Sequence, residues 1–208
     1  MSTEDQRLLK DSGQRQQFGT GAVRDVTKGK GRYDLMPAAP IDMLADAVER
    51  DSYDLDIPLD VFWDCGRYGL AQTLVTSQME NAVGAMRELA GYIQVKYWND
   101  NKITPTEMQL HSVPYHAIFR IARVYEKGAE KYAPRNWEKG MLLSRFLDSA
   151  QRHWYQVLEG KDDEDHAAQA LWNIIGWIQT KLWIDSNVLP LNLNDMPKYP
   201  EIQDLTGP

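Results

Sequence analysis

The chain has 208 residues, which is enough for one domain with a sizeable hydrophobic core. Its net charge of −7 argues against nonspecific binding to a nucleic acid polymer or to an anionic membrane surface. The single cysteine, Cys65, excludes an internal disulfide, and no apolar run approaches the roughly 20 residues that span a bilayer. Because the N-terminus is also polar, without a signal-peptide core, these features predict a cytoplasmic protein with no membrane partner.

The first third of the chain is predicted to begin with a mobile N-terminus over residues 1–17, which lack hydrophobic periodicity. Residues 18–34 are rich in glycine and basic side chains, and we expect them to form an irregular arm. Helical patterns follow over residues 41–49 and 59–68. No stretch carries the signals of a β-hairpin, so an all-α fold is expected.

A long amphipathic helix is predicted over residues 77–98. Ser77 to Glu80 has the spacing of a capping box, which marks a helix start. Apolar residues then recur at spacings of three and four, namely Met79, Val83, Met86, Ala90, Ile93 and Tyr97. This seam fits either the core of the chain or a contact with a second subunit, and we expect a homo-oligomer.

Three more helices are predicted in the second half of the chain. One runs over residues 114–130, the next from an N-cap at Ser144 to Gly160, and the last from Asp162 or Asp163 to Ser186. Prolines after residue 186 predict an extended tail over residues 187–208. The expected architecture is a helical bundle that forms a single domain over residues 18–186.

The last helix is apolar nearly all round, which is typical of a buried helix, yet it carries one polar stripe. Asp165, Gln169 and Asn173 follow one another at intervals of four residues. Partners on neighbouring helices and the wall of a pocket explain this stripe equally well. The run of four acidic residues from Asp162 to Asp165 exceeds what the helix dipole favours, and a divalent cation would relieve its repulsion.

The preceding helix offers weaker candidates. Asp148 and Arg152 are four residues apart and can pair on a solvated face. His153 lies at the edge of the apolar arc, where a histidine is more often a hydrogen-bonded core residue than a catalyst.

Two basic segments are the candidates for binding phosphate. The loop before residue 144 combines basic side chains with Tyr132 and Trp137, and Arg and Lys suit phosphates while aromatic rings can stack on a base. A polar surface loop with Trp137 plugging the core is the simpler alternative. The basic residues of this loop and of the glycine-rich arm are Lys127, Lys131, Arg135 and Lys139, and Arg24, Lys28, Lys30 and Arg32.

Four segments carry a family resemblance. They are GAVRDVTKGKGRYDLMP, VYEKGAEKYAPRNWEKG, SRFLDSAQRHW and EDHAAQALWN. These segments resemble the phage-associated dATP/dGTP diphosphohydrolase family, which is itself similar to the all-α, MazG-like nucleotide pyrophosphohydrolases. The resemblance covers about residues 18–40 and 117–180, so that residues 42–112 look like a helical insertion.

The resemblance implies that a purine deoxynucleoside triphosphate is hydrolysed to monophosphate and pyrophosphate with Mg²⁺ or another divalent cation, in the cytoplasm of an infected bacterial host. It implies a nucleotide as the small-molecule partner. The implied metal ligands are Glu126, Glu164 and Asp165, with Glu130 as a second choice, and the implied catalytic residues are Glu126, Asp148 and His153. The implied phosphate ligands are the basic residues of the arm and loop together with Arg152, and the implied base contacts are Tyr132, Asn136, Trp137 and Asn173.

The metal-ligand spacing departs from the MazG-like pattern of Glu-x-x-Glu followed by Glu-x-x-Asp. Glu126 and Glu130 are four apart, and no Glu-x-x-Glu occurs in the chain. Because basic side chains outnumber carboxylates that could converge, a second hypothesis is a noncatalytic sponge that sequesters a nucleotide or a cyclic nucleotide signal. A triphosphohydrolase of the HD type ranks last, because its His-Asp pair occurs here only in the reverse order, as Asp165-His166.

Overall fold

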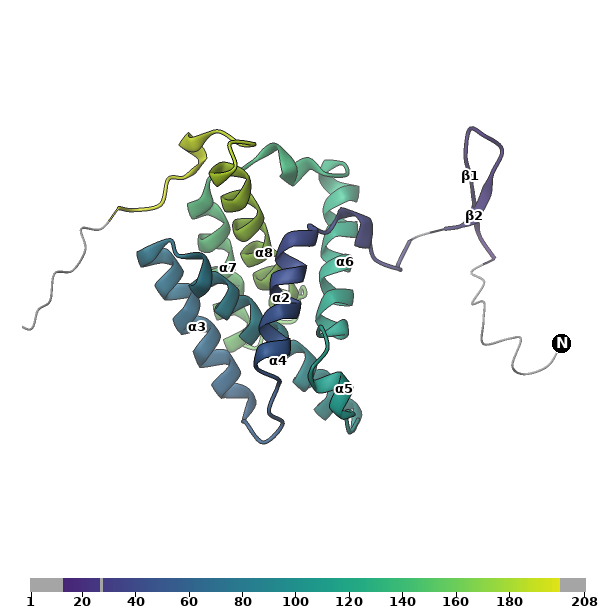
Figure 1. Ribbon diagram of the computed structural model, residues 1–208. Coiled ribbons are helices and arrows are strands. Elements are labelled where there is room, and N and C mark those ends of the chain that lie inside the picture. The colour runs from purple at the N-terminus through teal and green to yellow at the C-terminus, as the bar shows by residue number, and fades with distance from the viewer. Residues whose placement is uncertain (1–12, 27, 199–208) are drawn as a thin grey trace, which may run out of the picture.

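The computed structural model describes residues 13–26 and 28–198, and its body is a bundle of helices (Figure 1). The all-α prediction is therefore confirmed. Of the N-terminus expected to be mobile, residues 1–12 lie outside the described residues, as do residues 199–208 of the predicted tail. Among the helices that the structure describes, none combines the length and hydropathy that crossing a membrane requires.

A small β-hairpin precedes the bundle, so the prediction that the chain contains no hairpin was wrong. Strand β1, Arg15–Gln17, pairs antiparallel with β2, Val23–Asp25. The turn is closed by the amide of Phe18, which donates to the carbonyl of Ala22 at 2.8 Å. Strands this short do not show a period of two in sequence. The hairpin stands apart from the helices (Figure 1).

The first half of the bundle contains the three predicted helices in their predicted order and one short helix that was not predicted. It consists of the 3₁₀ turn η1, Tyr33–Leu35, and the helices α2, Ala38–Arg50, α3, Leu59–Thr76, α4, Met79–Asn101, and α5, Glu107–Leu110. The predicted capping box was wrong, because Ser77 ends α3 instead of starting α4. Its φ of 55° is left-handed and its amide donates to the carbonyl of Thr73 at 2.9 Å.

The second half contains the helices that build the candidate site. They are α6, Tyr115–Tyr132, η2, Asn136–Lys139, α7, Leu143–Leu158, and α8, His166–Asp185, followed by the turn η3, Leu191–Leu193. Helix α8 packs against α7, α4, α6 and α2 and is buried nearly all round, as its apolar circumference predicted.

The apolar seam of α4 is used inside the chain. Met86, Ala90 and Ile93 have no exposed surface, because α4 packs on α2, α3, α6 and α8. Core packing thus explains the middle of the seam, and the homo-oligomer stays a prediction.

The segment after α8 folds back onto the bundle and does not run out as an extended tail up to residue 198. Leu189 and Leu193 pack against Gly140, where an added Cβ would lie 2.6 Å from a Leu193 methyl carbon. The carboxylate of Asp195 accepts hydrogen bonds from the amide and hydroxyl of Ser144, at 2.9 and 2.5 Å. Ser144 was predicted to be the N-cap of α7, but it lies inside the helix; the N-cap position is Leu142, whose side chain makes no capping bond, and the distant Asp195 accepts the Ser144 amide instead.

Candidate functional site

A row of basic side chains on α6 forms the first part of the candidate site. Arg120, Arg123 and Lys127 follow at spacings of three and four residues, which places them on one face of the helix. They line a pocket of about 220 Å³ with the carboxylate of Asp165. The rest of its wall is Phe119, Val124 and Gln169. With three basic side chains and one carboxylate, the pocket is cationic, whereas the chain as a whole has a net charge of −7.

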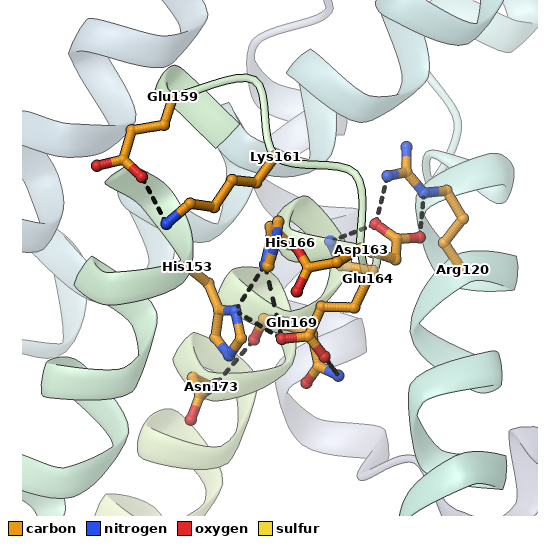
Figure 2. A network of polar contacts seen from close by, with 11 residues as sticks. Arg120, His153, Glu159, Lys161, Asp163, Glu164, His166, Gln169 and Asn173 are labelled. Carbon is orange, nitrogen blue, oxygen red and sulfur yellow. Dashed lines mark hydrogen bonds and ion pairs between the residues drawn. The ribbon is translucent and has the colours of Figure 1, made fainter. Parts of the chain in front are cut away.

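Arg120 and Asp165 join α6 to the start of α8. The guanidinium donates from Nε and Nη2 to the two carboxylate oxygens at 2.8 and 2.5 Å (Figure 2). Asp165 also accepts the amide of Ala168 at 3.0 Å, so it is the N-cap of α8, and the predicted caps Asp162 and Asp163 were wrong. Burial acts to raise the pKa of Asp165, but the bonds from Arg120 and its charge outweigh burial and hold the pKa below its usual value.

Arg123 pairs with a carboxylate that also holds the N-terminal arm. The buried side chain of Glu126 accepts Arg123 Nη1 at 2.9 Å and the amides of Gly29 and Gly31 at 2.7 and 3.3 Å. Gly31 has a φ of 79°, and a Cβ there would lie 2.8 Å from the Cβ of Ala122, so the close approach requires glycine. Glu126 is therefore an anchor that fixes the arm beside the basic pocket.

Lys127 is the least constrained of the three cations. In the part of the chain that the structure describes, no carboxylate lies within 4.0 Å of its ammonium group. The side chain of Lys127 is exposed at the pocket wall, where it can rotate toward an incoming anion.

An aromatic pocket of about 630 Å³ lies next to the basic one, and Phe119 borders both. Its lining is Tyr33, Tyr97, Val113, Tyr115, His116, Ile118 and Phe119. The rings of Tyr97 and His116 stack with centroids 3.8 Å apart and planes 15° apart. Burial lowers the pKa of His116 and the nearby Arg120 lowers it further, against a smaller opposing effect of Asp165, so the neutral ring is favoured. Tyr33 brings the end of the N-terminal arm into this pocket.

A group of two histidines and two carboxylates lies where α7 and α8 meet (Figure 2). His153 Nδ1 and His166 Nδ1 are 3.1 Å apart, and Glu164 Oε1 lies 3.6 Å from each. Asp163 Oδ1 lies 2.9 Å from His166 Nε2. Burial lowers the pKa of His153, although Glu164 opposes the shift, and the hydrogen bond to His166 lowers the pKa of Asp163. Gln169 donates to Glu164 at 3.4 Å, which links this group to the basic pocket.

The carboxylates expected to hold Mg²⁺ lie in three different places. Glu126 anchors the arm, Asp165 pairs with Arg120, and Glu164 belongs to the histidine group. Glu130 is exposed at the end of α6. Within residues 13–26 and 28–198, the one group of at least three histidine, cysteine or acidic side chains whose donor atoms lie within 4.8 Å of one another consists of His153, Glu164 and His166.

Of the basic residues expected to bind phosphate, Lys127 alone lines the basic pocket. Arg135 bonds to Glu138 and to the carbonyl of Asp34, and Lys139 bonds to Asn136. Lys131 lies over the ring of Tyr132, and Arg152 pairs with Asp148 on an exposed face, which removes Asp148 from the site as well. In the arm, Arg24 and Lys28 are exposed, Lys30 lies between the two anchored glycines, and Arg32 pairs with Asp34 at 2.7 Å.

The residues expected to contact a base are also dispersed. Trp137 is buried and stacks on Trp183 at 5.4 Å, so it plugs the core as its alternative explanation held. Asn173 is buried and donates to the carbonyl of Gln169 at 2.8 Å. Tyr132 is exposed outside both pockets, and Asn136 is bound by Lys139.

Sequence reasoning found Lys127, Asp165 and Gln169 in the basic pocket, but it missed the other residues that build the two pockets. Of the basic stripe on α6, Arg120 and Arg123 were not considered, although their spacing from Lys127 by seven and four residues is a signal that the sequence carries. The aromatic pocket joins Tyr33, Tyr97 and Phe119 from three separate segments, and no spacing rule relates them.

The comparison with protein families matched residues 98–185 to the family described as dATP/dGTP diphosphohydrolase, N-terminal. A comparison with curated proteins and one with solved structures gave no match. The matched segment contains α6, α7 and α8, and with them the basic pocket and the histidine group. The family resemblance drawn from the sequence is thereby confirmed for this part of the chain.

Proposed function

We propose that this chain, whose residues 98–185 match the dATP/dGTP diphosphohydrolase N-terminal family, binds a purine deoxynucleoside triphosphate and hydrolyses it to the monophosphate and pyrophosphate. The observation that carries the proposal is the adjacency of a cationic pocket and an aromatic pocket across Phe119. A nucleotide has the matching halves, an anionic phosphate chain and a planar base.

The phosphate chain is assigned to the basic pocket. Arg120 and Arg123 present planar guanidinium groups, which bind phosphate oxygens in pairs, and Lys127 adds a mobile point charge. Two carboxylates, Asp165 and Glu126, neutralise part of this charge, and they keep the two arginines oriented. The pocket thus combines two oriented cations with one adjustable cation.

The base is assigned to the aromatic pocket, whose volume of about 630 Å³ lies in the range of roughly 300–1,000 Å³ that small-molecule sites occupy. The stacked rings of Tyr97 and His116 leave Tyr33 and Phe119 at its rim, both exposed. Aromatic side chains of this kind stack on bases, and neutral His116 can exchange hydrogen bonds with the edge of a purine.

The proposed reaction is a displacement at the α-phosphorus. The oxygen of a water molecule forms a bond to that phosphorus, the bond to the bridging oxygen breaks, and pyrophosphate leaves with the electron pair while the attacking water loses a proton to the surrounding solvent. Arg120, Arg123 and Lys127 would neutralise the charge that develops on the phosphate oxygens. Mg²⁺ does not fit the carboxylates first expected to hold it, because Glu126 and Asp165 are already bound by arginines.

The test is to incubate the purified protein with each deoxynucleoside triphosphate and a panel of divalent cations, and to measure pyrophosphate release. Lys127→Met should lower kcat/KM about tenfold or more, because it removes a phosphate contact worth about 1.5–3 kcal/mol. Lys96→Met is the matched control, since Lys96 is an exposed lysine paired with Asp100 and lies in neither pocket. Equal activity of the two variants would remove the basic pocket from the proposal.

A noncatalytic sponge is the second candidate, and the excess of cations over convergent carboxylates near the pocket favours it. A sponge would release no pyrophosphate with any cation, and intact nucleotide would be recovered after the protein is denatured. In that case Lys127→Met should still weaken binding while the Lys96→Met control does not.

A further inference from the structure

We infer that His153, Glu164 and His166 form a binding site for a single divalent transition-metal ion of the zinc class. The three residues come together from the C-terminal half of α7, from the loop that follows it and from the first position of α8 (Figure 2). The inference rests on the geometry and chemistry of these side chains, and it does not depend on the nucleotide.

The distances among the three donor atoms fit one metal ion. Ligands at 2.0–2.1 Å from a tetrahedral zinc ion are about 3.3–3.4 Å apart. The separation of the two Nδ1 atoms is 3.1 Å, and each lies 3.6 Å from Glu164 Oε1. An ion therefore enters between them with small side-chain movements and without a change of backbone.

Neighbouring side chains orient two of the three ligands. Asp163 binds the far nitrogen of His166, Nε2, at 2.9 Å, which is the carboxylate–histidine arrangement that fixes the ring and its tautomer in metal sites. With the proton on Nε2, the lone pair of His166 Nδ1 points toward His153 and Glu164. Gln169 likewise donates to the second oxygen of Glu164 at 3.4 Å, which leaves Oε1 for the ion.

Burial leaves one side of the site open. The side chain of His166 is 1% exposed and that of His153 is 11% exposed, whereas Glu164 is 40% exposed. The two histidines thus close the site on its inner side. The fourth coordination position of the ion is left on the solvent side, where Glu164 is exposed. A site with three protein ligands and one open position is the arrangement that zinc enzymes use to hold a water molecule.

The ligand types select the metal. Two imidazole nitrogens suit Zn²⁺, Co²⁺, Ni²⁺ or Fe²⁺, while Mg²⁺ prefers oxygen ligands in an octahedral shell. Without a metal, the 3.1 Å contact of the two Nδ1 atoms is explained by one shared proton, so the competing explanation is a hydrogen-bonded histidine pair.

Titration of metal-stripped protein with Zn²⁺ and with Co²⁺, in the absence of nucleotide, separates these explanations. One ion should bind per chain, and Co²⁺ should give the intense visible absorption of a four-coordinate site with nitrogen ligands. Mg²⁺ in large excess should not displace it. Stoichiometry near zero, or a weak octahedral Co²⁺ spectrum, would overturn the inference.

Variants locate the site. Glu164→Gln removes an exposed ligand without disturbing the core, and it should weaken Zn²⁺ binding at least tenfold. Asp163→Ala should weaken it about 10- to 100-fold through His166 alone. Glu159→Gln is the control, because Glu159 is an exposed acid at the end of α7 that pairs with Lys161 outside the histidine group, and this variant should bind Zn²⁺ like the wild type. If Glu164→Gln binds zinc as the wild type does, the site is elsewhere. Since nucleotide is absent throughout, failure here leaves the proposed hydrolysis to its own test.

Discussion

Asp195 caps helix α7 across fifty-one positions of sequence by binding both the amide and the hydroxyl of Ser144. The contact closes the segment after α8 onto the start of α7, next to the packing of Leu189 and Leu193 on Gly140. The carboxylate also lies near the positive end of the α7 dipole, where a negative charge is favourable.

Asp195→Ala should therefore lower the free energy of unfolding by about 1 kcal/mol, the usual cost of losing a helix cap. Chemical denaturation followed by circular dichroism would measure the change. Asp195→Asn keeps an acceptor but loses the charge, so it should cost less than the alanine variant. Identical stability of the wild type and Asp195→Ala would show that the cap contributes nothing.

Glu126→Ala should release the N-terminal arm from α6. The variant leaves the amides of Gly29 and Gly31 without their acceptor, and hydrogen bonds to a charged group contribute about 1.5–3 kcal/mol. Hydrogen exchange at these two amides should accelerate about tenfold or more, while exchange in the core of α8 stays unchanged. Glu130→Ala, an exposed acid one turn further along α6, is the control and should leave both amides protected.

Phe119→Ala should weaken the binding of a purine nucleotide. Stacking of a base on an aromatic side chain contributes about 1–3 kcal/mol, so the dissociation constant of a nonhydrolysable dATP analogue should rise roughly five- to 150-fold. Calorimetric titration would measure it. Tyr155→Ala removes an exposed aromatic ring of α7 that borders neither pocket, and it should bind the analogue normally.

Asp165→Asn should tighten the binding of nucleotide in the presence of EDTA, because Arg120 loses its carboxylate and the basic pocket gains positive charge. The asparagine can still accept the amide of Ala168, so the cost in stability should stay near 1 kcal/mol for this partly exposed pair. The role of metal ligand expected from the sequence leads to another result, in which hydrolysis is abolished. Calorimetry with and without Mg²⁺ separates the two results.

Acid should destabilise the protein in part through His116. Its pKa in the folded state lies below the ordinary histidine value of 6.5, chiefly because of burial and also because of Arg120, with Asp165 opposing. The unfolded chain therefore takes up the proton first as pH falls, so the stability is fully present above pH 6.5 and is lost as the pH drops through the folded pKa. His116→Gln should show a smaller loss of Tm than the wild type between pH 7.5 and 5.5.

Hydrophobic periodicity predicted the helices of this fold well, and it failed at their ends. The circumference of α8 predicted a buried helix, because a pattern of apolar side chains depends only on residue type and spacing. Caps depend on backbone angles and on distant partners. Ser77 has the sequence signal of a helix start, but its left-handed backbone ends α3. The amide of Ser144 near the start of α7 is bound by Asp195, which follows η3 far along the chain.

The candidate site was predicted in part. Both explanations of the polar stripe apply: Asp165 and Gln169 line a pocket, while Asp165 also pairs with Arg120 of α6 and Asn173 bonds to the carbonyl of Gln169. His153 was considered as a lone histidine, because its partner His166 lies beyond a loop whose path the sequence does not reveal. Trp137 was expected to contact a base, but its ring is buried against Trp183, and the sequence of a basic loop does not tell whether an aromatic ring points into the core or out of it.

The guanidinium of Arg123 can pair fully with only one carboxylate or phosphate at a time. In this structure it pairs with Glu126, whose carboxylate also accepts an amide of the N-terminal arm. An anion that draws the guanidinium into the basic pocket removes a positive charge from beside Glu126. The hydrogen bonds that Glu126 accepts from the amides of Gly29 and Gly31 then change in strength. By thermodynamic linkage, the factor by which the anion changes the equilibrium constant for docking of the arm equals the factor by which docking of the arm changes the affinity for the anion. Arg123 thus couples the docking of the N-terminal arm on α6 to the binding of an anion in the basic pocket.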